Sequence, residues 1–323
     1  MNSRDDLSRV ALSIAAVERD TGIGKDTLRV WERRYGFPQP DRDAHGERTY
    51  PLDQVEKLRT IKRLMDQGHR PGRIVAQSME ALQHLSRGEA ALQSNRAVPH
   101  AHNNPDLMPY IALLQSQDHD GMRRELLKVL SHEGLQHFVT EVVAPLTRMV
   151  GDAWARGDLA VYEEHLYTEC VTSLMRQAIL AIPRADSGGA PTVLLTTLPQ
   201  EAHGLGLLMV ESLLSLQGCR CVSLGTQTPV RDIAQAAKAH RVDVVALSFS
   251  LNMNPNHVVD GLAELNLLLP ASIEVWVGGG APVLRRRALE HVVVLNDFDA
   301  IAHAIQQWRV QNIKPESKSN TSA

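Results

Sequence analysis

The segment LPQEAHGLG, residues 198–206, carries a carboxylate, an imidazole and two glycines directly after an apolar run. The neutral ring of His203 can bind a metal through one nitrogen, and Glu201 can accept the proton of the other nitrogen and so fix the tautomer. Gly204 and Gly206 let the backbone turn and let a bulky group lie close to it. A zinc site takes about four protein ligands, and no second His or Cys stands nearby at metal spacing, so a lone histidine suits a metal already held by a macrocycle. The competing interpretation is a histidine that caps a helix and packs on a sheet.

The elements that must position this segment are apolar strands separated by helical stretches. Such alternation predicts a parallel sheet covered by helices on both faces, which is a doubly wound, Rossmann-like α/β domain. Ligands of these sheets bind at the carboxyl ends of the strands, where His203 follows the first strand and where the segments 224–230, 248–250 and 278–280 lie. The predicted strands cover residues 192–198, 220–225, 242–250, 273–279 and 291–297.

The spacing of these segments resembles the signature of cobalamin-binding domains, which is D-x-H-x-x-G, then S-x-L, then G-G. Here 41 residues separate Gly206 from the serine motif, and 27 separate that motif from the glycines. Over residues 190–312 the resemblance implies that His203 is the lower axial ligand of cobalt, in place of the cofactor's own benzimidazole. The residues that it implies around the cofactor and its nucleotide tail are Glu201, Gly204, Gly206, Gly225, Thr228, Ser248, Ser250, Gly278 and Gly279.

Two positions depart from that signature. Glu201 stands where aspartate is usual, and because a longer carboxylate can still reach an imidazole N–H, we expect altered tuning of the histidine and not its loss. Ser250 stands where leucine is common, which changes the pocket for the nucleotide tail.

The N-terminal block carries a different chemistry, that of basic side chains on a short helix. Residues 13–37 read as a helix, a glycine turn and a second helix, which is helix-turn-helix spacing, and the glycine-containing segment after them suits a wing beside the groove. Basic and hydroxyl side chains there can donate to phosphates and base edges, although a lone arginine-rich helix can equally be a solvated face. The candidate DNA-binding residues are Lys25, Thr27, Arg29, Arg33, Arg34, Tyr35, Arg42, Arg48 and Tyr50.

The stretch TLRVWERRYGFPQPDRDAHGERTY resembles the winged helix-turn-helix of the MerR family, which has T-L-R-x-W-E-R-R-[YF]-G followed by P-x-R and G-x-R-x-Y. The resemblance covers residues 11–80 and implies binding to double-stranded operator DNA as a dimer or higher oligomer, with Trp31 in the core. Metal sensors of that family carry cysteines just after this domain. None stands there in this chain, so its effector is expected to bind elsewhere.

The middle block, residues 106–183, shows helical periodicity that predicts a four-helix bundle. Trp154, followed ten residues later by Glu164 and His165, can be a core tryptophan and a solvated polar pair. Beside a cobalamin domain, the motif resembles the helical cap of CarH/LitR-type light-sensing repressors. That resemblance implies that Trp154, Val161, Glu164 and His165 surround the 5′-deoxyadenosyl group of adenosylcobalamin on the upper face of cobalt.

One position departs from the light-sensing family. A histidine usually follows the tryptophan and becomes the upper ligand after light, but here the residue is Ala155. Either His165 or water takes the vacant position, or the photoproduct differs, or light sensing is weakened.

Composition places the chain among ordinary globular proteins. It has 323 residues, of which 43% are hydrophobic and 22% charged, no apolar run that spans a bilayer and no secretory pattern, so we expect a cytoplasmic protein without membrane contact. Its three cysteines cannot form a disulfide framework, and Cys219 and Cys221 are interpreted as buried thiols. The predicted parts are a DNA-binding domain over 10–85, a linker over 86–105, the bundle over 106–183, the cobalamin domain over 190–312 and a disordered tail over 313–323.

The order of these parts is that of the CarH/LitR-type repressors. We therefore interpret the chain as a cobalamin-dependent transcriptional regulator and not an enzyme: a repressor that assembles with adenosylcobalamin in the dark, as a dimer to tetramer, and leaves its operator when light breaks the cobalt–carbon bond. The alternatives are a light-independent or cofactor-free regulator, a corrinoid methyl-carrier protein and a nucleotide-binding domain. The DNA-binding block opposes the methyl carrier, and the missing G-x-G-x-x-G fingerprint opposes nucleotide binding.

Overall fold

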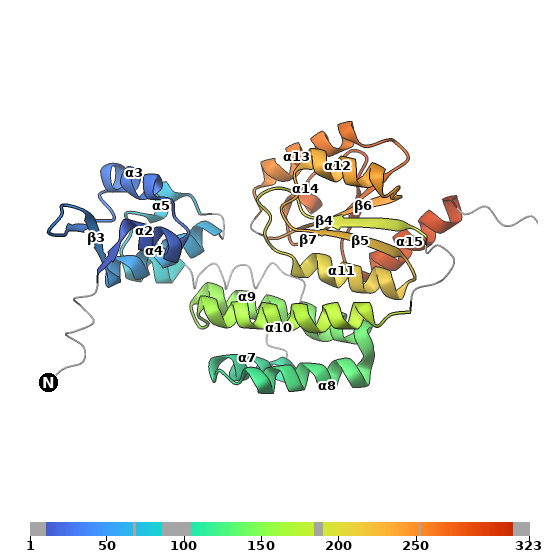
Figure 1. Ribbon diagram of the computed structural model, residues 1–323, viewed down its shortest axis with the longest axis horizontal. Helices are drawn as coiled ribbons and strands as arrows, with labels where there is room; N and C mark the ends of the chain where they lie inside the picture. Colours follow the sequence, from blue (N-terminus) through green and yellow to red (C-terminus); the bar gives the residue numbers. More distant parts are fainter. Residues whose placement is uncertain (1–10, 67–68, 86–104, 184–189, 252, 313–323) are drawn as a thin grey trace, which may run out of the picture. The chain divides into compact units, whose positions relative to one another are not determined.

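A computed structural model describes residues 11–66, 69–85, 105–183, 190–251 and 253–312 (Figure 1). The chain divides into two compact units, the first made of Met1–Asn103 with Met149–Ala160, the second of Asn104–Arg148 with Val161–Ala323. The predicted first linker and the predicted disordered tail fall almost entirely on residues 86–104 and 313–323, outside the described residues.

The first unit contains the predicted helix-turn-helix, formed by α2 (Ile14–Thr21) and α3 (Lys25–Tyr35). The Ser13 hydroxyl caps α2 by accepting the amide hydrogen of Ala16. Gly22 ends α2 with φ 69°, a backbone conformation that glycine adopts without strain. The other elements are β1 (Ala11–Ser13), β2 (Asp41–Arg42), β3 (Arg48–Pro51), α4 (Leu52–Asp66), α5 (Pro71–Ile74) and the helical residues 79–85.

The strands of the first unit pair antiparallel in the order β1-β3-β2, so the predicted wing is the hairpin of β2 and β3. The short strand β1, which the sequence did not indicate, ties the start of the domain to this hairpin. Trp31 is buried among Val17, Leu28 and Leu58, which confirms its predicted place in the core.

Four helices form the predicted bundle among the described residues of the middle block. Gly134 (φ 81°, ψ 170°) breaks α8, so that the third predicted helix begins just after it and continues through a π-helical stretch into α9. A single glycine thus sets the boundary between two of the four predicted helices. The elements are η1 (Pro105–Leu107), α7 (Met108–Gln115), α8 (His119–His137), η2 (Phe138–Val143), α9 (Ala144–Arg156) and α10 (Val161–Leu180).

The rest of the second unit is the predicted parallel sheet, with strand order β5-β4-β6-β7-β8. The chain enters at β4, crosses to β5 and then returns to β6 on the other side, so the switch point lies between β4 and β6. The strands are β4 (Thr192–Thr196), β5 (Arg220–Gly225), β6 (Val244–Phe249), β7 (Glu274–Gly279) and β8 (Val293–Leu295).

Helices cover both faces of this sheet, as a doubly wound fold requires. In Figure 1, α11 and α15 lie on one face and α12 and α13 on the other, and α10 of the bundle packs against α11. Buried side chains such as Leu194, Val245 and Val277 fill the core beneath α12 and α13. The helices are α11 (Leu205–Leu216), α12 (Val230–Ala239), α13 (Pro255–Leu268), α14 (Val283–Arg286) and α15 (Phe298–Asn312).

Candidate functional site

His203 lies in the loop between β4 and α11, beside the switch point of the sheet. Its side chain is 68% exposed, while that of Glu201 is only 1% exposed. The ring Nδ1 is 2.6 Å from Glu201 Oε1, and the backbone N–H of His203 donates to the same oxygen at 3.0 Å. The predicted carboxylate–imidazole contact is therefore confirmed. Because Glu201 holds Nδ1, a metal at this ring would be bound through Nε2.

The Glu201 carboxylate also joins two loops. Its second oxygen, Oε2, accepts the backbone N–H of Ser250 at 2.7 Å, from the loop between β6 and α13. Burial alone would raise the pKa of Glu201, but the hydrogen bonds from His203 and Ser250 outweigh it and hold the pKa below its ordinary value. A buried carboxylate that stays charged in this way can orient a metal-binding imidazole at neutral pH.

Three of the glycines predicted around the cofactor pack closely against neighbouring protein atoms, and the tail channel itself stays a prediction. A Cβ on Gly206 would stand 2.6 Å from the Ser248 hydroxyl, and one on Gly204 would stand 3.3 Å from Thr226 Cγ2. Gly279, at φ +111°, has no room for a Cβ because the backbone oxygen of Phe249 is there. The β4, β6 and β7 ends therefore approach each other more closely than larger residues would permit.

Threonines at the end of β4 bind the loop after β5. Thr196 Oγ1 lies 2.7 Å from Thr228 Oγ1 and donates to the carbonyl of Gly225 at 3.0 Å, so these two predicted cofactor residues are held to β4. Thr197 Oγ1 accepts the backbone N–H of Gln227. Sequence reasoning missed both Thr196 and Thr197, and the only signal for them was a pair of hydroxyls at the carboxyl end of a predicted strand.

Glu164 and His165, the polar pair predicted for the upper face, contact each other at the start of α10. His165 Nδ1 is 2.7 Å from Glu164 Oε2, and the Thr168 hydroxyl donates to Glu164 Oε1 at 2.8 Å. The ring of His165 is 70% exposed, and Val161 one turn earlier is also exposed. Thr168 was missed, although its position four residues after Glu164 puts it on the same helical face.

The ion pair between Arg176 and Glu211 sets the register of α10 on α11. Arg176 Nη1 lies 2.8 Å from Glu211 Oε2, and both helices begin at the same end of the second unit, on the left in Figure 1. At a rise of about 1.5 Å per residue, Glu164 and His165 lie about 8 Å beyond the start of α11.

Trp154 belongs to the first unit, where it is half-buried. The Arg63 guanidinium carbon lies 5.8 Å from the centre of its ring, and Arg63 Nη1 donates to the Trp154 carbonyl at 3.4 Å. The role of Trp154 beside the adenosyl group stays a prediction.

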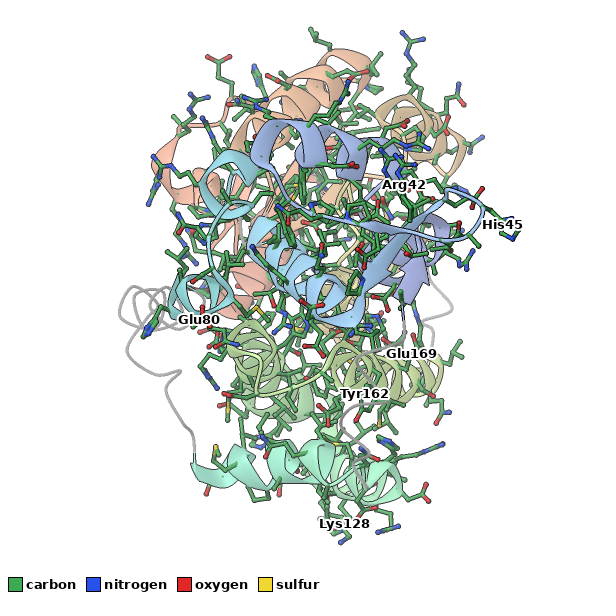
Figure 2. The ribbon with its side chains drawn as sticks, turned by 90° about the vertical axis from the view of Figure 1, so that its left-hand side faces the viewer. Arg42, His45, Glu80, Lys128, Tyr162 and Glu169 are labelled. Atoms are coloured by element: carbon green, nitrogen blue, oxygen red, sulfur yellow. The ribbon has the colours of Figure 1, made fainter. Side chains whose placement is uncertain are left out.

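The candidate DNA-binding residues gather on α3 and the β2–β3 hairpin. Thr27, Arg29, Arg33 and Arg34 are exposed on α3. Figure 2 shows Arg42 on the hairpin and His45 at its outer end, and the Arg42 guanidinium donates to the Gly46 carbonyl within this turn. The arrangement gives one exposed basic helix and one exposed hairpin, the two parts of a winged DNA-binding surface.

Three predicted DNA-binding residues are partly exposed. Lys25 Nζ lies 3.4 Å from Glu18 Oε2, and Arg48 Nε donates to Glu32 Oε2 at 2.9 Å. Tyr35 has the Arg34 guanidinium carbon 5.4 Å from its ring centre. A duplex contact by Lys25 or Arg48 would therefore compete with an existing carboxylate partner.

The prediction that Tyr50 binds DNA from the wing is wrong. Its side chain is fully buried in the core of the first unit, and its hydroxyl has no hydrogen-bond partner among the described residues. Alternation along β3 explains this position, because Thr49 and Tyr50 point to opposite faces of the strand and Tyr50 takes the inner one. From here Tyr50 cannot contact DNA.

The cysteines behave as the sequence indicated. Cys219 is buried and Cys221 half-buried, and burial raises the pKa of these thiols to about 11 and about 12. In the part of the chain that the structure describes, no three His, Cys, Asp or Glu side chains gather so as to hold a metal ion. Within the same residues, no helix is both long and apolar enough to cross a bilayer.

Three domain families match the chain. The MerR HTH family regulatory protein matches residues 12–76, and two families described as B12 binding domains match residues 191–305 and 109–179. The second B12 match falls on the helical bundle, so the bundle and the sheet both resemble parts of cobalamin-binding proteins.

Two relatives match over most of the chain. The HTH-type transcriptional repressor CarH of Myxococcus xanthus is 33% identical over 84% of this chain and 90% of its own, and CarA of the same organism is 30% identical over 84% and 87%. Among solved structures, the Methanosarcina barkeri monomethylamine corrinoid protein covers 64% of this chain and 99% of its own, with a TM-score of 0.50 and 16% identity. At that identity the likeness concerns the fold.

Proposed function

Because the chain belongs to the family of cobalamin-binding, MerR-type transcriptional regulators that includes CarH and CarA, we propose that it is a light-responsive repressor that binds adenosylcobalamin through His203. The observation that carries this proposal is the exposed imidazole held by a buried carboxylate at the switch point of the sheet. The proposed place of action is the cytoplasm, where the operator DNA is.

The residues at this edge suit a bulky cobalt macrocycle. Glu201 accepts Nδ1–H and directs Nε2 of His203 toward the metal, while Gly206 and Gly279 let the ends of β4, β6 and β7 lie close together at this edge. Two protein residues thus fix the ligand, and the macrocycle supplies the other positions around cobalt. Bound adenosylcobalamin would supply a cobalt–carbon bond that light breaks.

The residues proposed to lie on the upper face of cobalt are at the start of α10. Glu164 and His165 lie on the first turn of α10, the helix that packs against α11, and Thr168 fixes the Glu164 carboxylate. These polar atoms can bind the hydroxyls and ring nitrogens of an adenosyl group, and Val161 can pack against its apolar surfaces. Contact with both the bundle and the sheet domain would let the adenosyl group bias their arrangement, since a ligand shifts an equilibrium only by its differential affinity.

The N-terminal domain would bind DNA through α3 and the β2–β3 hairpin. Arg33 and Arg34 on the exposed face of α3 can bind phosphates or base edges of an operator. We propose that the loaded chain forms a dimer to tetramer in the dark, because several winged domains on one assembly raise avidity by about 10²–10⁴ without new contacts. Light then loosens the assembly and lifts repression.

A light-independent regulator is the second candidate, and Ala155 is the observation that favours it. No imidazole follows Trp154, so a new upper ligand after light would have to come from His165 or from water. Under this alternative, cobalamin loading alone changes DNA binding and illumination changes nothing further.

DNA binding by the full chain separates these candidates. The chain loaded with adenosylcobalamin in the dark is used to select duplexes from a random pool, and the selected duplex is then titrated in the dark and after green light. The proposal expects tight binding in the dark that is lost after light. Equal affinity in the dark and after light would contradict it, and a difference between the loaded and the cofactor-free chain would then favour the light-independent regulator.

The axial ligand has its own test in His203→Ala. Loss of the imidazole removes the metal bond, so we expect adenosylcobalamin retention on gel filtration to fall by at least about tenfold. His240→Ala is the matched control, because it removes an exposed imidazole at the C-terminal end of α12, outside the proposed site. Undiminished retention by His203→Ala would remove His203 from the site.

A further inference from the structure

Three loops at the carboxyl edge of the sheet are tied together by two buried side chains. Glu201 joins the His203 loop to the β6–α13 loop through the Ser250 amide. Thr197, the first residue after β4, joins the His203 loop to the β5–α12 loop, and its side chain is fully buried. The connection through Thr197 makes no direct contact with the ring of His203.

The Thr197 hydroxyl makes two hydrogen bonds, one as the donor and one as the acceptor. It donates to the backbone carbonyl of Glu201 at 2.6 Å and accepts the backbone N–H of Gln227 at 2.8 Å. Its own carbonyl accepts the N–H of Thr228 at 3.1 Å. One side chain thus holds the residue that orients His203 and, at the same time, the neighbouring loop.

The backbone of Glu201 is held on both sides as a result. Its N–H donates to the Leu198 carbonyl at 3.1 Å, closing a turn in which Gln200 has φ 73°, and its carbonyl is held by Thr197. A non-glycine residue in this left-handed region costs free energy, so the turn persists because its surroundings hold it. Without the Thr197 bond, the backbone of Glu201 would lose one of the constraints that aim its carboxylate at the ring of His203, and the amides of His203 and Ser250 would be left to hold that carboxylate alone.

Thr196 provides an internal comparison. It is equally buried and one residue earlier, but its hydroxyl bonds Thr228 and the Gly225 carbonyl and makes no described bond to Glu201. Both threonines therefore anchor the β5–α12 loop, and only Thr197 also holds the histidine loop.

We propose that Thr197 is a positioning residue for the metal-binding histidine, acting through Glu201. The inference rests on the proposed function of His203. It also implies that the three loops are assembled before the cofactor arrives, so that binding does not have to order them.

The test reads the axial ligand directly. The full chain, grown with histidine carrying the heavy nitrogen isotope, is loaded with cob(II)alamin, and its electron paramagnetic resonance spectrum is recorded. A protein histidine on cobalt splits the lines into doublets, whereas the cofactor's own benzimidazole gives triplets. We expect doublets in the unsubstituted chain, a fall of about 10–100-fold in affinity and loss of doublets in Thr197→Val, and recovery of both in Thr197→Ser.

Thr196→Val is the matched control and should keep the doublets. Doublets and full affinity in Thr197→Val would overturn this inference alone, as would an equal loss in Thr196→Val. No doublets in the unsubstituted chain would overturn the function proposed for His203, and this inference with it.

A second measurement covers the case in which Thr197→Val does not fold. Amide hydrogen exchange is followed in the unsubstituted, cofactor-free full chain. Slow exchange of the Gln227 and Ser250 amides, which donate to Thr197 and Glu201, is the expected result. Fast exchange at Gln227 would show that the bond does not hold the loops, and would overturn the proposal.

Discussion

Glu201 shows how a single residue combines local and distant contacts. Its bond to His203 is local, because the two residues are separated by one position in a loop, and the sequence predicted it. Its bond to the Ser250 amide joins positions 49 residues apart. That contact depends on β4 and β6 being neighbours in the sheet, which no local pattern encodes.

The same distinction explains the residues that sequence reasoning missed or misplaced. Trp31 was correctly assigned to the core, and the bond between Glu201 and His203 was anticipated. Thr197 was missed because its partners lie on two loops whose meeting depends on strand order. Tyr50 was misplaced because motif position alone does not say which face of a two-stranded wing a side chain takes.

Substitutions of Tyr50 and of Arg33 should therefore have different effects on DNA binding. Arg33→Ala is expected to weaken duplex binding and to reduce the slope of log affinity against log salt by about 0.9 for each lost phosphate contact. Tyr50→Phe should leave affinity unchanged, and removal of its unpaired buried hydroxyl should not lower the free energy of unfolding. Fluorescence anisotropy titrations at several salt concentrations measure both. An affinity loss in Tyr50→Phe as large as that in Arg33→Ala would reinstate Tyr50 as a contact.

At the scale of elements, sequence periodicity predicted the types of the helices and strands and their order well. It predicted less well the residues at which they begin and end. The strand expected over 291–297 is only Val293–Leu295, and that expected over 192–198 stops at Thr196. After β4, Thr197 and Leu198 stay buried in the loop, while the predicted range around β8 includes the polar residues His291, Asn296 and Asp297. The helix break at Gly134 lies at a residue that adopts a positive φ without strain.

The pairing of β6 with β7 should depend on Gly279 more than on Gly278. A Cβ at Gly279 meets the Phe249 backbone, and its φ of +111° is unfavourable for any other residue, whereas a Cβ at Gly278 would stand 3.3 Å from the Leu295 carbonyl oxygen. Gly279→Ala should thus lower the free energy of unfolding by about 2–3 kcal/mol more than Gly278→Ala. Urea unfolding of the full chain, followed by circular dichroism, measures the difference. Equal midpoints for the two variants would show that the β7 end is adaptable.

At the scale of the whole molecule, the chain joins a DNA reader, a helical bundle and a cobalamin-binding sheet. The sequence predicted these three parts and their order because each carries its own periodicity and motif. Contacts between distant segments, such as Arg176 with Glu211, required the structure. They show how the bundle meets the sheet domain through α10 and α11.

The central claim is that light acting on a cofactor bound through His203 changes the assembly that binds DNA. It is tested most directly by loading the full chain with adenosylcobalamin in the dark, then recording its absorption spectrum and its size by chromatography before and after green light. We expect a changed spectrum and a smaller species after light, with neither change in His203→Ala. A bound cofactor whose illumination leaves the size of the assembly unaltered would contradict the claim.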